Sequence, residues 1–237
     1  MALPVLSHPI FDLTVPSTKD QITYRPFLVK EEKILLLAQE ADNLKDLTRS
    51  VKQIINNCII EGSIDVDHAP TFDIEYIFLK LRSNSVSDIA KFNIVDPDTG
   101  KEIEVEIDLK IVEIHNTEGH SKDIVLNDQV SLLMKYPTYE ILKKVNVSDT
   151  NEVSATFEMI KHCIDKVTVG EDEVHEFKDY SNTEVDNFVD SLTSQSFQDI
   201  QKFFDTMPKL QHDVDYKIGK KTKTRTFSGL SDFFAYA

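Results

Sequence analysis

The stretch Tyr24-Arg25-Pro26-Phe27-Leu28-Val29-Lys30-Glu31-Glu32-Lys33 joins an extended segment to the first amphipathic helix of the chain. Upstream, β-branched and aromatic residues cluster at 10–15 and 21–28 on either side of a polar connection, and this pattern predicts a β-hairpin. Pro26 is expected to end the second strand because proline has no backbone N–H for a strand ladder. Beyond it, we expect Phe27 to Val29 to be buried and the charged residues to form the opening turn of the helix.

The composition is that of a globular protein with an acidic surface. The chain has 237 residues, and its 41 acidic and 26 basic residues give a net charge of −15. This charge repels nucleic acid and anionic membranes, so general binding to either is not expected. The two cysteines, Cys58 and Cys163, lie in apolar helical patterns and predict buried free thiols in a reducing compartment, with a single disulfide as the alternative. Apolar runs of at most five residues predict neither a signal peptide nor a membrane span.

Two groups of helices are predicted, around residues 30–82 and 150–207. The clearest apolar stripe in the first group consists of Leu44, Leu47, Val51, Ile54, Ile55, Cys58 and Ile59. In the second group, Ser181 and Glu184 have the spacing of a capping box, which marks a helix start. Pro208 is expected to terminate the last helix of this group.

Between the helical groups, a small antiparallel sheet is predicted at about residues 90–137. Its first hairpin turns at Asp96-Pro97-Asp98-Thr99-Gly100. This segment has the spacing of a calcium loop for three residues only. An EF-hand needs Gly at its sixth position and Glu at its twelfth, where Lys101 and Ile107 stand, so we interpret the segment as a turn.

A second hairpin is predicted near the C-terminus, where apolar and charged residues alternate from Leu210 to Ile218 and threonines alternate from Thr222 to Thr226. We favour a three-residue loop, Gly219-Lys220-Lys221, because it places Arg225 opposite Asp215. A two-residue loop would instead place Tyr216 and Val214 opposite Lys223 and Arg225. The remaining residues, 229–237, predict a short apolar helix that needs a surface to cover it.

No motif in the sequence predicts catalysis, a cofactor or a metal. His115, His120 and Asp123 are the best candidates for a metal site, but we interpret them as loop or sheet-end residues. The basic run at the C-terminal hairpin could meet an acidic protein or nucleic acid; neutralisation across the strands by Asp213 and Asp215 is the simpler interpretation. This run consists of Lys217, Lys220, Lys221, Lys223 and Arg225.

Six segments spread along the chain carry a family resemblance. They are Ala2-Leu3-Pro4 with the hairpin after it, Tyr24 to Lys33, Phe72 to Ile77 with Leu81-Arg82, the strand into Tyr136-Pro137, Phe203 to Leu210, and Gly229 to Phe234. Together they resemble the baseplate hub-assembly protein family of T4-type contractile-tailed bacteriophages. The resemblance implies a protein made late in infection that helps to assemble the central hub of the tail baseplate. It implies no enzymatic activity and no cofactor.

The expected fold is α+β: an N-terminal hairpin, helical groups around 30–82 and 150–207, a small antiparallel central sheet, and a C-terminal hairpin with a short helix. The expected parts are residues 1–89 with the first hairpin and helices, 90–148 with the β-rich part, and 149–237 with the later helices and hairpin. We expect these parts to pack together as one or two domains.

The expected function is non-enzymatic and works by protein–protein interaction. The resemblance implies other baseplate hub or tape-measure proteins as partners and assembly in the host cytoplasm, and it leaves open whether the protein stays in the virion tail baseplate. Candidate partner-binding residues are Phe233, Phe234, Tyr236, Lys220 and Lys221, where the aromatic residues either dock on a partner or cap the protein's own core. Alternatives are a transient assembly chaperone that is absent from the virion, a hydrolase with a carboxylate pair, and a nucleic-acid-binding module that uses the basic hairpin.

Overall fold

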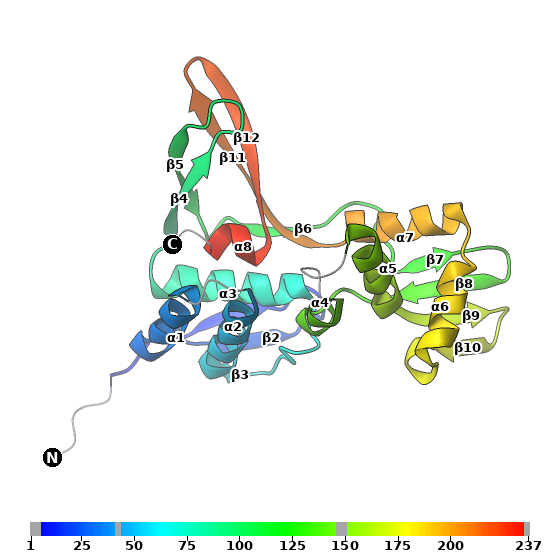
Figure 1. Ribbon diagram of the computed structural model, residues 1–237. Coiled ribbons are helices and arrows are strands. Elements are labelled where there is room, and N and C mark those ends of the chain that lie inside the picture. Colours follow the sequence, from blue (N-terminus) through cyan, green and yellow to red (C-terminus); the bar gives the residue numbers. More distant parts are fainter. Residues whose placement is uncertain (1–5, 41–43, 146–150, 235–237) are drawn as a thin grey trace. The chain divides into compact units, whose positions relative to one another are not determined.

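The computed structural model describes residues 6–40, 44–145 and 151–234, and the chain divides into two compact units (Figure 1). Unit 1 comprises Met1–His115 and Lys209–Ala237, and unit 2 comprises Asn116–Pro208. Both units combine helices with small antiparallel sheets, which confirms the α+β class.

Unit 1 contains four helices and eight strands in its described residues. They are β1 Phe11–Thr14, β2 Gln21–Tyr24, α1 Val29–Glu40, α2 Leu44–Cys58, β3 Ile59–Glu61, α3 Thr71–Ser85, β4 Ile89–Val95, β5 Glu102–Asp108, β6 Glu113–His115, β11 Lys209–Ile218, β12 Lys221–Ser228 and α8 Gly229–Phe234. The predicted N-terminal hairpin is β1–β2, and β3 extends it to a sheet of order β1-β2-β3. The predicted stripe of α2 is confirmed, because Val51, Ile54 and Ile55 are fully buried.

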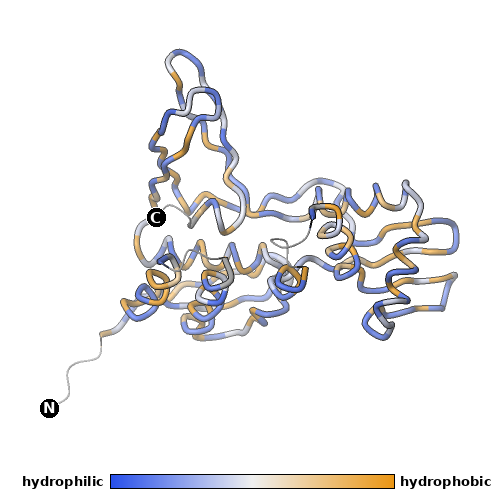
Figure 2. The backbone as a smooth tube through the Cα atoms, viewed as in Figure 1, coloured by the Kyte–Doolittle hydropathy of each residue, from blue (hydrophilic) through white to orange (hydrophobic). Residues whose placement is uncertain are grey.

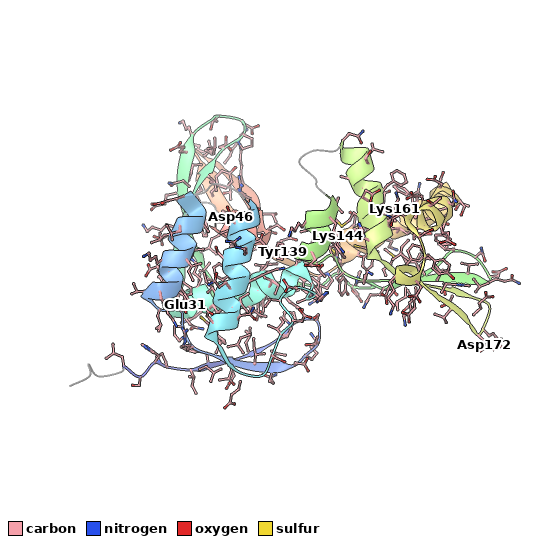
Figure 3. All side chains as sticks on the ribbon, turned by 60° about the horizontal axis from the view of Figure 1, so that its bottom comes forward. Glu31, Asp46, Tyr139, Lys144, Lys161 and Asp172 are labelled. Atoms are coloured by element: carbon pink, nitrogen blue, oxygen red, sulfur yellow. The ribbon has the colours of Figure 1, made fainter. Side chains whose placement is uncertain are left out.

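The junction after β2 differs from its prediction at one side chain. β2 ends at Tyr24, before Pro26, and Phe27 is buried as expected. The prediction was wrong for Val29, which is 79% exposed, while Glu31 is fully buried. Because α1 already begins at Val29, its first turn directs Glu31 inward; Figure 3 labels this residue at the start of α1.

Glu31 connects three segments of unit 1. Its carboxylate accepts a hydrogen bond from Arg25 Nη2 at 3.1 Å and from the Leu28 backbone N–H at 2.9 Å. Arg25 also donates to the backbone oxygen of Asn57, at the end of α2, at 2.9 Å. Burial alone would raise the pKa of Glu31, but the hydrogen bonds from Arg25 and Leu28 outweigh it and lower this pKa. The charged form of Glu31 is therefore the one that the fold stabilises.

A second buried carboxylate, Asp73, holds the β1–β2 turn on α3. It accepts hydrogen bonds from the Ser17 backbone N–H at 3.0 Å and from the Ser17 hydroxyl. Burial raises the pKa of Asp73, and the hydrogen bonds from Ser17 oppose this shift. The turn is thus attached to the first turn of α3 by a polar contact inside the unit.

Two long hairpins, β4–β5 and β11–β12, project beside each other from unit 1 (Figure 1). Apolar and polar positions alternate along them, as their colours show (Figure 2). The favoured three-residue loop was wrong: Ile218 pairs with Lys221, and Tyr216 pairs with Lys223. Gly219 has a φ of +59°, which suits the first position of a two-residue type II′ turn. This register is the alternative that the sequence left open.

Unit 2 is a four-stranded sheet of order β10-β9-β8-β7 with helices packed on it. Its elements are β7 Asp123–Val125, β8 Val130–Met134, α4 Tyr139–Val145, α5 Glu152–Cys163, β9 Ile164–Val169, β10 Glu173–Glu176, the short 3₁₀ helix Phe177–Asp179, α6 Asn182–Asp190 and α7 Ser194–Thr206. Its core includes Leu132, Ile164 and Phe203. The capping box of Ser181 and Glu184 is confirmed at the start of α6.

The strands predicted between residues 90 and 137 are present, but they pair in three separate sheets. β4 pairs with β5, β6 pairs with β11, and β7 and β8 join β9 and β10. Both cysteines are free and buried, as predicted. Burial raises the pKa of the Cys58 thiol to about 11, so this thiol stays protonated at neutral pH.

We predict that Glu31→Ala destabilises the protein by about 3 kcal/mol, because it leaves Arg25 without its buried partner and the start of α1 without a hydrogen-bond acceptor. Glu32→Ala, on the exposed neighbour, is the matched control and should change stability by no more than about 0.5 kcal/mol. Urea denaturation followed by circular dichroism measures both. Equal effects of the two substitutions would contradict the role given to Glu31.

We also predict that residues 116–208 unfold cooperatively when expressed alone, because the core cluster of unit 2 lies entirely within them. Residues 1–115 alone should not, because they lack the buried side chains of Leu210, Phe227 and Phe233. The division of the chain at residues 89 and 148 remains a prediction, and the same experiment tests it. Cooperative unfolding of residues 149–237 alone would favour that division.

Candidate protein interaction site

The two projecting hairpins are joined by the buried carboxylate of Asp96. One oxygen of this carboxylate, Oδ1, accepts hydrogen bonds from the Thr99 backbone N–H at 2.9 Å and from its hydroxyl at 2.8 Å. These bonds close the predicted turn after β4. The other oxygen, Oδ2, accepts from Tyr216 Oη at 3.0 Å and from Lys223 Nζ at 2.5 Å. Asp96 therefore binds its own turn and both strands of the second hairpin.

Lys223 completes this contact, which we call the Asp96 clasp (Asp96, Asp98, Tyr216 and Lys223). Its Nζ lies 2.7 Å from Asp98 Oδ2 as well as close to Asp96. The ammonium of Lys223 holds the pKa of Asp96 well below its usual range, and the two carboxylates raise the pKa of Lys223. Tyr216 and Lys223 are direct cross-strand partners, so the two-residue loop is what brings both to Asp96.

Below the clasp, the hairpins share an aromatic core. The ring of Phe92 on β4 lies 5.1 Å from that of Phe227 on β12 and 6.3 Å from that of Phe233 on α8. Arg82 of α3 donates a hydrogen bond to the backbone oxygen of Phe233 at 2.9 Å. The projection is thus anchored to the body of unit 1 by packing and by a charged donor.

The structure describes the side chain of only one of the three aromatic residues that were candidates for partner binding. Phe233 is fully buried, so of the two roles foreseen for it the structure shows the cap of the core. Phe234 lies at the end of α8, and its side chain is outside the described part. Tyr236 lies outside the described residues altogether.

Three lysines lie around the turn of the second hairpin: Lys217, Lys220 and Lys221, here called the basic tip. All three are exposed, and none forms an ion pair with any residue that the structure describes. The predicted neutralisation by Asp213 and Asp215 was wrong. These aspartates accept hydrogen bonds from the hydroxyls of their cross-strand threonines, with Thr224 Oγ1 2.6 Å from Asp215 Oδ1. Only Lys223 of the basic run is held by carboxylates at less than 3 Å in the described chain.

The outer face of the first hairpin has the opposite charge. Glu102, Glu104 and Glu106 alternate along the exposed side of β5. Lys91, on β4, lies 2.9 Å from Glu104 and 3.2 Å from Glu106. The projection therefore has an acidic outer face and a basic tip.

The histidines do not form a metal centre. His120 uses both ring nitrogens in hydrogen bonds, to Thr206 Oγ1 at 2.9 Å and to Tyr136 Oη at 3.0 Å. Of the candidates that we interpreted as loop or sheet-end residues, His115 belongs to β6 in unit 1, whereas His120 and Asp123 belong to unit 2. Across the part of the chain that the structure describes, no three His, Cys, Asp or Glu side chains gather to hold a metal ion.

An apolar groove of unit 1 was missed by sequence reasoning. It is lined by Leu6, Val29 and Val86, which are 73%, 79% and 62% exposed, together with neighbouring polar residues. The sequence contains no signal for this groove, because Val29 belongs to the same apolar run, Phe27-Leu28-Val29, as the buried Phe27. The clasp was missed as well, since the pairing of Lys223 with a turn over a hundred residues away is a tertiary contact.

The fold and these surfaces define an α+β protein with a charged projection, a feature that suits protein–protein contact. The chain matches the family of T4 bacteriophage base plate proteins over residues 8–235. Since this match covers nearly the whole chain, the protein belongs to that family and has a structural role in the phage baseplate. No curated protein and no solved structure matches the chain significantly.

We predict that Asp96→Asn destabilises the projection most at neutral pH. The folded pKa of Asp96 lies below its unfolded value of about 3.9. Its charge therefore stabilises the fold above that pH, and this contribution is lost as pH falls through the folded pKa. The difference in urea midpoint between wild type and variant should be larger at pH 7 than at pH 3.

Asp98→Asn is the control for this prediction. Asp98 contacts the same ammonium, but its side chain is 76% exposed. It should produce a smaller difference at both pH values. A difference for Asp96→Asn that is the same at pH 3 and pH 7 would show that its charge does not support the clasp.

Proposed function

We propose that this protein is a permanent, non-enzymatic subunit of the central hub of the tail baseplate, where it binds hub or tape-measure proteins. The observation that supports this most is the projection of unit 1, in which the Asp96 clasp and an aromatic core join two hairpins and exposed lysines lie at the end. The clasp and the aromatic core contact the second hairpin at separate places along its strands, so the position of its turn relative to the first hairpin depends on both. Such a construction suits a protein whose task is to place a contact surface.

Full-length membership in a baseplate family supports a role in the assembled tail, with other baseplate proteins as its partners. The segments that resemble hub-assembly proteins support the more specific place at the hub. Synthesis late in infection and assembly in the host cytoplasm follow from the same resemblance. None of the helices in the described ranges has the length and apolar character that a membrane span requires.

A transient assembly chaperone is the second candidate, and one observation favours it. Val29, Leu36 and Leu37 of α1 are all more than half exposed. A chaperone needs an apolar surface to hold an incomplete partner, and it leaves before the particle matures. A permanent subunit would instead keep such a surface covered in the finished tail.

We predict that mass spectrometry of purified mature phage particles finds this chain in constant proportion to the other baseplate proteins. Tail-assembly intermediates purified from the same infection serve as the comparison. Presence in intermediates and loss from mature particles would identify a chaperone. Absence from both would contradict a place in the tail.

A further inference from the structure

We infer that the basic tip is the docking surface for an acidic patch on another protein of the baseplate, an inference that rests on the proposed function. The first argument is that the lysines of the basic tip are exposed and form no ion pair with any described residue. Elsewhere in the described chain many lysines lie within 3 Å of a carboxylate, including Lys52, Lys80 and Lys161. The basic tip instead places three exposed and unpaired ammonium groups around one two-residue turn. In a chain of net charge −15, this is a local field of the opposite sign.

The second argument is the way in which the tip is held. The Asp96 clasp bonds β12 through Lys223 and β11 through Tyr216, close to the turn that carries the basic tip. Aromatic packing of Phe92 and Phe227 restrains the same strands nearer to the body of unit 1. A contact surface that is ordered before binding loses less conformational entropy on binding, so fewer contacts suffice for a given affinity. The clasp and the aromatic packing therefore order a turn whose three lysines form no ion pair in the described chain.

The third argument concerns the class of partner. Affinity for duplex DNA grows with the number of phosphates that a protein neutralises, and the tip offers only three lysines for this purpose. Glu102, Glu104 and Glu106 line the outer face of the adjacent hairpin. Lys91 pairs with Glu104 and Glu106, but three carboxylates against one ammonium leave an excess of negative charge that would repel a duplex lying along the projection. A compact acidic patch on a protein can contact the basic tip without contacting the acidic face of the first hairpin. Charge complementarity of this kind gives specificity and speeds association.

The test is the double charge reversal Lys220→Glu/Lys221→Glu in the full-length protein. The matched control is Lys143→Glu/Lys144→Glu, a pair of adjacent, exposed lysines on α4 in unit 2; Figure 3 labels Lys144. Both variants change the charge equally. The tip variant removes no contact given for the described chain and should keep the thermal midpoint of wild type, whereas the control replaces two cations in the last turn of α4 and should lower this midpoint slightly. Each is supplied from a plasmid during infection by a phage that lacks this gene.

The measurements are the amount of this chain in purified tails, by mass spectrometry, and the titre of infectious particles. We expect the tip variant to lower both by at least about tenfold, because like charges then face each other at the contact, while the control stays within about twofold of wild type. Incorporation of the tip variant at the level of wild type would overturn the inference. An equal loss for tip variant and control would also overturn it, since the effect would then come from total charge.

Two further outcomes separate this inference from its alternatives. The purified proteins are also passed over immobilised fragments of phage double-stranded DNA at low salt. Retention of wild type that the tip variant loses would assign the tip to nucleic acid and overturn a protein partner. If wild-type protein is itself missing from tails and from assembly intermediates, the proposed function fails. If wild type is present and the tip variant is incorporated equally, only the docking surface fails.

Discussion

The projection of unit 1 depends on one buried carboxylate. Asp96 receives a tyrosine hydroxyl and a lysine ammonium from the second hairpin, and a backbone N–H and a hydroxyl from its own turn. A carboxylate has room for about four hydrogen bonds, so its accepting capacity is used within the protein. A buried charge without partners is costly, and this cost selects the hairpin register that delivers Lys223 and Tyr216 together.

The same principle recurs in the body of unit 1. Glu31 joins the end of β2 to the end of α2 through Arg25, and Asp73 joins the first hairpin to α3 through Ser17. The protein thus uses a few of its many acids as internal connectors between segments distant in sequence. Their pKa values differ in direction because burial outweighs the Ser17 hydrogen bonds and the charge of Lys19 at Asp73, whereas the hydrogen bonds and charge of Arg25 help to outweigh burial at Glu31. Ionisation at neutral pH therefore favours the fold at Glu31 and opposes it at Asp73.

Sequence patterns predicted those features whose contacts lie between residues close together in the chain. The apolar stripe of α2, the capping box at Ser181 and the Asp96 turn are encoded within a few residues, and the structure confirms each. The register of the second hairpin could not be predicted in this way, because pairing charges within the hairpin favours Asp215 as the partner of Arg225. The partner that decides the register, Asp96, lies in another hairpin. The exposure of Val29 was missed for a related reason, since helix phase is set by the contact between Glu31 and Arg25.

These internal connections also explain why the unpaired lysines at the basic tip are informative. Lysines such as Lys52, Lys80 and Lys161 lie within 3 Å of a carboxylate, and Asp213 and Asp215 lie on the same hairpin as the basic tip. Their carboxylates accept bonds from threonine hydroxyls, and Lys223 is drawn to the clasp. The arrangement therefore leaves three positive charges at the end of a braced projection and keeps the negative charges on its outer face. In a protein of a baseplate family, this separation of charge favours a contact made end-on by the projection, with an acidic surface of a neighbouring subunit.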